Sequence, residues 1–556
     1  MQRIIGKIKS DWIFLVATLL YAVSIAILFP FLRFYVDNPD TISYISIAEK
    51  YANTDFANAV NGYWSPLISW LLALFLKAGG GEIIAFKYLQ LLIGWFAIFN
   101  FVKLVHAIVH SITMRAVLSL AIVPFVLDYS LLHLTPDLLF LSVILFYLRI
   151  TTEKEFFNHR HFGLIAGVLG VLMYFSKSFG FCFFLAHFTF LFLRDYFQTK
   201  EYAFKRHLRK NYLQAIVCFV CMSSIWIYLL SDKYRHFTIS ENAAFNLSRE
   251  VAAAPGKDNK LPVLSGGLFQ PVNNTAVNAW EDPGLATTIT PLHIFSKPED
   301  LATYRQVLKR NLLAIYYFDF RRQAGTLFII IFSAFLFFGK RKRIYTDDYY
   351  FSLFTALILI YGGYALILIH ARYIWVCTLF MLLLAAWLLE ELMPKNKKRH
   401  VFARIFFVVT LALIGIKRPV KELLFSKDKD ISASGLLNAM LNPFDAMSAT
   451  YNIDRSFSEV KKELKNHIRP GSSIVSIQNP GGIRDGYTHG SLIALATGSK
   501  YFGQVSEGDS MLMQKDNLKA DYLISFSDVQ KVSDTLNWRP DFARMNLQLK
   551  IYRRKN

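Results

Sequence analysis

Long apolar stretches, separated by polar connections, fill the first three quarters of the 556-residue chain. Stretches of this kind are typical of membrane-spanning helices. The first follows a basic N-terminus and has no small-residue cleavage site, so we expect an uncleaved helix and not a signal peptide. We predict eleven spans, near residues 12–31, 83–105, 114–132, 136–150, 162–176, 178–194, 211–230, 324–339, 349–369, 372–391 and 401–416.

The connection 32–82 after the first span carries acids, asparagines and aromatics where a simple membrane protein has a short turn. From Thr41 to Tyr51 apolar residues recur at helical spacing, so one face of this helix is expected to lie on the bilayer interface. Pro66 favours the start of a second interfacial helix that runs to Lys77. An acid held there by interfacial helices suggests chemistry on a lipid-borne substrate.

A second long connection, 231–323, mixes Pro, Gly and Asn with short apolar pieces and ends in an amphipathic run from Ala302 to Tyr317. Loops of this length in compact proteins are usually functional or act as lids. We therefore expect this outer loop to be functional or to act as a lid.

After Lys417 the composition becomes that of a soluble protein, with alternating helices and strands. We accordingly divide the chain into a transmembrane catalytic domain, 1–416, and a soluble α/β domain, 417–556. The elements predicted in the second domain are a helix over 454–467, a strand over Ser473–Ile477, a glycine-rich bend, a helix near 488–497, and strands near 521–526 and 546–552.

Composition and charge indicate a polytopic membrane protein, 54% hydrophobic and 16% aromatic. The net charge of +21 could suggest a nucleic-acid partner, but the basic clusters fall in short loops on one side of the predicted spans. This bias predicts a cytoplasmic N-terminus, and it places 32–82, 231–323 and 417–556 outside. We expect no nucleic-acid partner. The four cysteines lie in apolar segments, where packed thiols are expected.

Four ionisable residues lie at the outer ends of predicted spans: Asp40, Asp137, Lys177 and Arg372. Each has a structural explanation when taken alone. Either acid could cap a helix, and the lysine could extend its amine to the interface. Two acids and two cations that converge on one face are harder to explain in this way, and ionisable residues at membrane depth are usually functional.

The order of these motifs resembles that of the GT-C class of membrane glycosyltransferases. Within this class, the chain resembles the branch that contains the protein O-mannosyltransferases and the enzymes that add aminoarabinose to lipid A. The resemblance covers nearly the whole chain. It is carried by Asp40-Thr41-Ile42-Ser43-Tyr44, NGYWSPLISWLLA, TPDLLFLSVILFYL, YFSKSFGF and HARYIWV, and less specifically by YRHFTISENAAFNL and AWEDPG.

The resemblance implies a sugar donor on a polyprenyl phosphate and a hydroxyl acceptor on a protein, lipid or glycan. It implies Asp40 as the catalytic base, which takes the proton of the acceptor hydroxyl, while Asp137 orients the acceptor or shares that proton. It also implies cations that stabilise the leaving phosphate. The remaining residues implied in substrate binding are Tyr44, Trp64, Lys177, His370, Arg372 and Tyr373.

One departure concerns the donor phosphate. The aminoarabinose enzymes have a lysine just before this Pro-Leu pair, whereas Trp64 and Ser65 precede Pro66 here. We therefore expect the phosphate to be held by Lys177, by Arg372, or by a basic residue of the long outer loop such as Arg235.

No cofactor is certain from the sequence. Asp40 and Asp137 could hold a divalent cation, but no His/Asp cluster with ligand spacing is evident, so no metal ligand is assigned. A transporter, flippase or polymerase of lipid-linked glycans is the alternative function, although no internal repeat is seen. A third alternative is a membrane-anchored binding protein that works through 417–556. The expected location is a bacterial inner membrane, with the active site on the periplasmic side.

Overall fold

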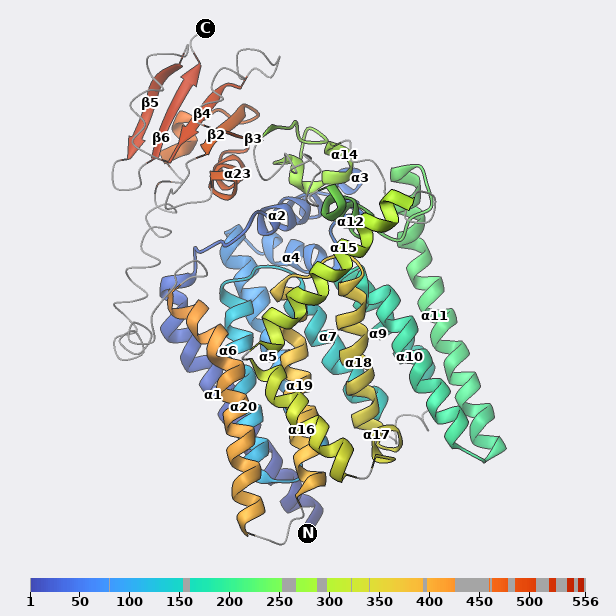
Figure 1. The fold of residues 1–556 in the computed structure, drawn as a ribbon. Helices are drawn as coiled ribbons and strands as arrows, with labels where there is room; N and C mark the ends of the chain where they lie inside the picture. Colours follow the sequence, from blue (N-terminus) through green and yellow to red (C-terminus); the bar gives the residue numbers. More distant parts are fainter. Residues whose placement is uncertain are drawn as a thin grey trace.

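The chain folds into a helical bundle with a β-sheet at one end (Figure 1). The structure is a computed structural model. It describes residues 2–79, 81–153, 161–252, 267–287, 298–321, 323–339, 341–393, 398–425, 460, 463–478, 486–506, 520–526, 538–544 and 549–554.

Each of the eleven segments predicted to span the membrane is a helix, which confirms the multi-span helical fold. The N-terminus and α17 (Arg343–Thr346) lie at the opposite end of the bundle from the sheet (Figure 1). The eleven helices are α1 (Gln2–Leu32), α5 (Glu82–Ile108), α6 (Ile112–Leu131), α7 (Asp137–Thr152), α9 (Phe162–Ser176), α10 (Phe179–Gln198), α11 (Tyr202–Tyr234), α16 (Ala324–Phe338), α18 (Asp348–Ala365), α19 (Ala371–Leu392) and α20 (Lys398–Phe425).

The number of spans is lower than the eleven predicted. In the described part of the chain, seven helices are long and apolar enough to cross a membrane, or eight if α16 and the helix before it, bent by 88°, form one span. Part of the difference lies in helix length. α7 has 16 residues and α9 has 15, which at about 1.5 Å per residue is less than the apolar thickness of a bilayer.

The first outer connection forms two helices at the predicted places, α2 (Pro39–Ala52) and α4 (Pro66–Lys77), with the short α3 (Phe56–Ala59) between them. The expectation that one face of α2 lies on the bilayer interface is wrong. Every residue from Asp40 to Ala48 is buried, because α4 covers α2 on one side and α23 (Gly486–Thr497) packs against it from the sheet region.

The long outer loop is largely helical where it is described, and its amphipathic run lies in α15 as expected. Its central part also supplies a short strand to the sheet. Its elements are α12 (Asn242–Ala252), β1 (Gly267–Leu268), a 3-10 turn over Ala279–Glu281, α14 (Pro283–Ala286), α15 (Pro298–Ile315) and a π-helical turn over Tyr316–Phe320.

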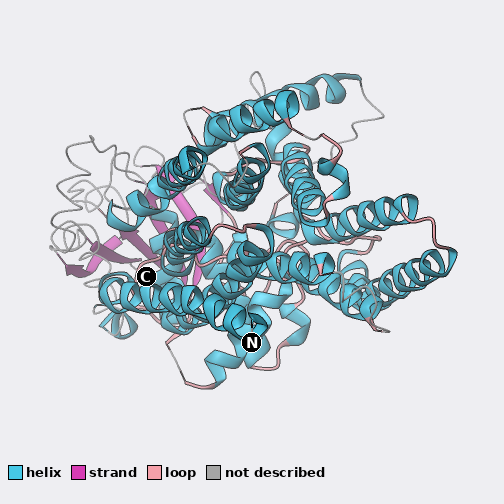
Figure 2. Ribbon diagram, turned by 90° about the horizontal axis from the view of Figure 1, so that it is seen from below, coloured by secondary structure: helices cyan, strands magenta, loops and turns pink. Residues whose placement is uncertain are grey.

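The C-terminal region forms a mixed sheet with the strand order β1-β3-β2-β4-β6-β5. β2 pairs in parallel with β3 and β4, whereas the outer pairs are antiparallel. The sheet lies toward one side of the bundle (Figure 2). Its later strands are β2 (Ser473–Gln478), β3 (Lys500–Ser506), β4 (Tyr522–Ser525), β5 (Trp538–Arg544) and β6 (Leu549–Arg554).

The sequence predicted three of these strands and the helix α23, but it missed β3 and β5. Only residues 460 and 463–467 of the helix predicted over 454–467 are described, and all of them are helical. Most of the glycine-rich bend lies outside the described residues. β1 joins the sheet from the long outer loop, so the sheet draws on both sides of residue 417.

Candidate active site

A cavity of about 250 Å³ opens where the outer connections meet the ends of α7, α10, α18 and α19. Aromatic and aliphatic side chains make up much of its wall, with a few charged groups among them. Mostly apolar pockets with a few convergent polar groups are typical ligand sites. Seven of the nine predicted site residues line it: Asp40, Tyr44, Trp64, Asp137, Lys177, Arg372 and Tyr373.

Asp40 lies in the first turn of α2 and is 6% exposed. It is not the helix cap, because Asn38 accepts the capping hydrogen bond from the backbone N–H of Thr41. Its carboxylate instead accepts a hydrogen bond from Trp280 Nε1 at 2.9 Å and pairs with the guanidinium of Arg372. The acid is therefore directed at the cavity, and the start of the helix favours its negative charge.

Asp137 is the first residue of α7 and pairs with Lys177, which ends α9. Its other oxygen accepts a hydrogen bond from Thr135 Oγ1 at 2.7 Å. The Lys177 amine also lies 3.8 Å from the ring centroid of Tyr373 and 5.2 Å from that of Tyr364. Aromatic faces attract such a cation, so the amine is held at the cavity wall by a carboxylate and two rings.

The two acids are joined through the connection between α6 and α7. Thr41 Oγ1 on α2 donates a hydrogen bond at 3.2 Å to the backbone carbonyl of Leu134, which lies just before Thr135 and Asp137. The cavity thus contains two acids and two cations in two pairs, with every carboxylate oxygen of Asp40 and Asp137 bonded to a donor. A divalent ion at these two acids would have to displace Lys177 or Arg372.

An aromatic wall closes the cavity beside Asp40. The Trp64 ring lies edge-on to Tyr44 at 4.9 Å between centroids and 6.2 Å from Trp280. Trp64 Nε1 donates to the backbone carbonyl of Trp280. The Asn61 side chain accepts hydrogen bonds from the backbone N–H groups of Tyr63 and Trp64, an asparagine turn that fixes this segment.

Trp280 is a site residue without a role predicted from the sequence, although it lies in the stretch AWEDPG. The two acids that follow Trp280 anchor the segment. Glu281 pairs with Lys50 and accepts a hydrogen bond from Ser46 Oγ on α2 at 2.6 Å. Asp282 pairs with Lys233 of α11 at 2.8 Å.

The C-terminal region holds the same segment from the other side. Tyr501 of β3 donates its backbone N–H to the carbonyl of Val277 at 2.8 Å, and Asn278 Nδ2 donates to Ser491 Oγ on α23 at 3.1 Å. Trp280 is thereby fixed between α2 and the sheet region. A tryptophan followed by two acids in a long loop was the signal available in the sequence.

Two predicted residues do not line the cavity. The Arg235 side chain is 82% exposed and pairs with Asp232 on the same helix. His370 is exposed, and its ring packs edge-on against Tyr373 at 5.4 Å. Of the cations in the described part of the chain, Lys177 and Arg372 are those that line the cavity. Trp64 and Ser65, the two residues before Pro66, also line the cavity.

Comparisons with known proteins agree with this architecture. Residues 64–228 match the family model described as dolichyl-phosphate-mannose-protein mannosyltransferase. No curated protein matches the chain significantly. The crystal structure of ArnT from Cupriavidus metallidurans bound to undecaprenyl phosphate has a TM-score of 0.54 at 14% identity, covering 96% of this chain and 97% of that chain.

The apo structure of the same ArnT gives a TM-score of 0.51 at the same identity and coverage. At 14% identity this likeness shows the fold, and the family match adds the class of enzyme. The chain therefore has an ArnT-like GT-C fold, and its residues 64–228 are similar to the dolichyl-phosphate-mannose-protein mannosyltransferase family.

Proposed function

We propose that this protein transfers a sugar from a polyprenyl-phosphate donor to a hydroxyl acceptor on a protein, lipid or glycan, with Asp40 as the general base. The observation that carries the proposal is the meeting of Asp40, Asp137, Lys177 and Arg372 around one cavity. These residues come from four separate elements. Ionisable groups brought together at such a depth are characteristic of a reaction site.

The donor phosphate would be held by Lys177 and Arg372. An ArnT of the same fold binds undecaprenyl phosphate, which supports a lipid-phosphate donor here. Both cations have partly exposed side chains, 16% for Lys177 and 21% for Arg372, so a ligand can reach them. The phosphate would replace a carboxylate on one or both cations, a charge-assisted exchange that keeps the cations paired.

The reaction forms one bond and breaks one. The acceptor oxygen attacks the anomeric carbon of the sugar, and the bond from that carbon to the phosphate oxygen breaks. The polyprenyl phosphate leaves with the electron pair, stabilised by the two cations. The acceptor proton passes to Asp40. Direct displacement inverts the anomeric configuration.

Asp40 suits the base better than Asp137 because of its partners. Once the phosphate draws Arg372 away, Asp40 retains only the neutral Trp280 N–H. Asp137 retains the Thr135 hydroxyl and faces both cations. We assign Asp137 the role of orienting the acceptor, and we assign Tyr44, Trp64 and Tyr373 to the walls of the sugar and phosphate sites.

We further propose a bacterial inner membrane with the cavity on the periplasmic side. The cavity lies at the same end of the bundle as α2 and the sheet. α17, which follows the basic run starting at Lys340, lies at the other end with the N-terminus (Figure 1). Basic loops stay in the cytoplasm, so the cavity faces outward.

The test is transfer of label from radiolabelled polyprenyl-phosphate sugars in membranes that contain the full chain. Asp40→Asn is expected to slow transfer about 100- to 10,000-fold, the usual range for a general base, at normal protein levels. Glu49→Gln, a matched neutralisation on the same helix outside the cavity, should keep wild-type activity. Wild-type transfer by Asp40→Asn would remove the catalytic assignment. If the wild type transfers from no donor while it moves lipid-linked sugars across vesicles, the glycosyltransferase proposal fails in favour of a flippase.

A further inference from the structure

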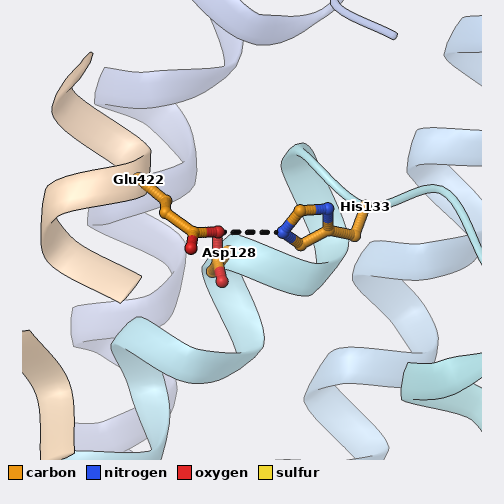
Figure 3. A group of neighbouring side chains, drawn as sticks. All are labelled: Asp128, His133 and Glu422. Carbon is orange, nitrogen blue, oxygen red and sulfur yellow. Dashed lines mark hydrogen bonds and ion pairs between the residues drawn. The ribbon is translucent and has the colours of Figure 1, made fainter. Parts of the chain in front are cut away.

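A second group of ionisable side chains lies behind the cavity, at the outer ends of α6 and α20 (Figure 3). Asp128 belongs to the last turn of α6, His133 to the connection before α7, and Glu422 to the last turns of α20. All three residues are buried, at 3%, 3% and 6% exposed. None of them lines the cavity, and the reaction proposed above does not use them.

The three side chains converge as metal ligands do. One potential ligand atom from each lies within 4.8 Å of the others. His133 Nε2 is 3.1 Å from Glu422 Oε2 and 3.8 Å from Asp128 Oδ1. Ligand atoms that share an ion at about 2.0–2.2 Å each are separated by distances of this order. Figure 3 shows the imidazole edge directed at the two carboxylates.

A fourth residue orients the imidazole. His133 Nδ1 lies 2.6 Å from Asp37 Oδ2, a carboxylate outside the group of three. A histidine that ligates a metal usually donates its other N–H to such a carboxylate, which fixes the tautomer and raises the basicity of the ligating nitrogen. Here that bond leaves Nε2 to face Asp128 and Glu422.

One ligand atom is left without a hydrogen bond. Asp128 Oδ1 is fully enclosed and accepts no hydrogen bond from any described residue, although it is directed at His133. A buried carboxylate oxygen in this state is costly unless a cation satisfies it. This unsatisfied oxygen is independent of the clustering of the three side chains, and it faces the space between them.

The charge of the group favours a cation as its occupant. Three carboxylates, those of Asp37, Asp128 and Glu422, surround His133, and Arg418 pairs with Glu422 Oε1 at 2.7 Å. A divalent cation bound by Asp128, Glu422 and a neutral imidazole would offset the negative charge of these two carboxylates. One imidazole nitrogen with carboxylate oxygens suits Zn²⁺ or Mn²⁺ better than Mg²⁺ or Ca²⁺, which prefer all-oxygen sites.

We propose that Asp128, His133 and Glu422 bind a divalent transition-metal ion, Zn²⁺ or Mn²⁺, as a structural clamp. Asp37 lies three residues before Asp40, and His133 lies four residues before Asp137. The ion would therefore tie together the two segments that carry the cavity acids, and would anchor both to α20. It does not contact the substrate cavity.

A proton on His133 Nε2 is the competing occupant. Burial by itself lowers the pKa of the imidazole, but Asp37 and Asp128 outweigh it and raise the pKa of His133 to about 10. An imidazolium would pair with the carboxylates in place of the ion. The two occupants differ in a quantity that can be measured directly, the metal content.

The first measurement is the metal content of the full chain, tag-free and purified in detergent without chelators, by mass spectrometry of the elements. About one Zn²⁺ or Mn²⁺ per chain is expected for the wild type, and Asp128→Asn should lose it. Asp319→Asn is the matched control, because Asp319 is a buried acid that bonds to Tyr361 outside the group. It should keep the ion. An ion retained by Asp128→Asn would contradict the assignment.

The second measurement needs no variant. Chelation should lower the unfolding midpoint of the wild type by several degrees, and added Zn²⁺ or Mn²⁺ should restore it. A wild-type chain that purifies without metal, and whose midpoint responds to neither ion, would overturn the proposal and leave the protonated histidine. Neither readout depends on sugar transfer, so the clamp and the proposed function can fail separately.

Discussion

Two groups of charged side chains lie side by side in this protein, and the same two segments supply residues to both. The start of α2 and the residue pair before it provide Asp37 to the buried group and Asp40 to the cavity. The connection from α6 to α7 similarly leads from His133 to Asp137. Only a few residues separate the members of each segment.

The groups differ in charge balance and in access. In the cavity each acid has one cation, and Lys177 and Arg372 keep 16% and 21% of their side-chain surface exposed. In the buried group three carboxylates surround one imidazole, Arg418 pairs with one of them, and the side chains of Asp37 and His133 are each only 4% exposed. A balanced, accessible group can exchange partners with an incoming phosphate. An enclosed group with excess negative charge instead requires a resident cation.

Among the variants that test the difference between the two groups, Lys177→Gln is expected to have the largest effect, a higher KM for the donor. If the cavity cations take up the donor phosphate, losing one charge-assisted contact should raise the KM for the donor about 10- to 100-fold. The measurement is the initial transfer rate over a range of donor concentrations. Lys77→Gln, at an exposed lysine that ends α4, is the control. An unchanged KM would show that the amine does not hold the phosphate.

A smaller effect is expected from Trp280→Phe, which keeps an aromatic ring but removes the donor to Asp40. Losing one hydrogen bond to a charged group should slow turnover about tenfold, with little change in the KM for the donor. Trp70→Phe, at a tryptophan of α4 that does not line the cavity, should keep wild-type kcat. A change confined to KM would instead place Trp280 in the donor site.

The smallest effect is expected from Arg235→Ala, because that side chain lies in solvent outside both groups. Transfer rate and donor KM should stay within about twofold of wild type, as is usual for exposed ion pairs. When both variants are measured in the same membranes, the comparison of Arg235→Ala with Lys177→Gln distinguishes a cation outside the cavity from one that lines it. A loss as large as that of Lys177→Gln would restore the role suggested by the sequence.

Several features of the site could be predicted from local sequence. Asp40, Asp137, Lys177 and Arg372 each follow or begin an apolar helix, so alternation of the helices across a membrane brings them to one end. Tyr44, Trp64 and Tyr373 lie close to these residues in the chain and reach the cavity with them. His370 lies just as close to Arg372 in the chain, yet its side chain is exposed. Proximity in sequence does not decide the direction in which a side chain points.

The partners across long separations could not be predicted in this way. Trp280 lies 240 residues from Asp40, and Glu422 lies 289 residues from His133. Each meets its partner only because a loop or a distant helix packs against the first outer connection. No metal ligand set was evident in the sequence for the same reason, since Glu422 carries no spacing signal relative to Asp128 or His133.

By itself, then, the sequence determined the positions of the helices and the end of the bundle at which the charged residues gather. These follow from hydrophobic periodicity and from the cost of leaving charges in an apolar layer, both of which act on short stretches. The class of enzyme was implied by the resemblance of the motifs to a known family. The tertiary structure alone decided that α2 is buried and that Trp280 reaches Asp40. It also decided that Glu422 faces His133, because side-chain pairing depends on how distant segments pack, and only the folded chain specifies that.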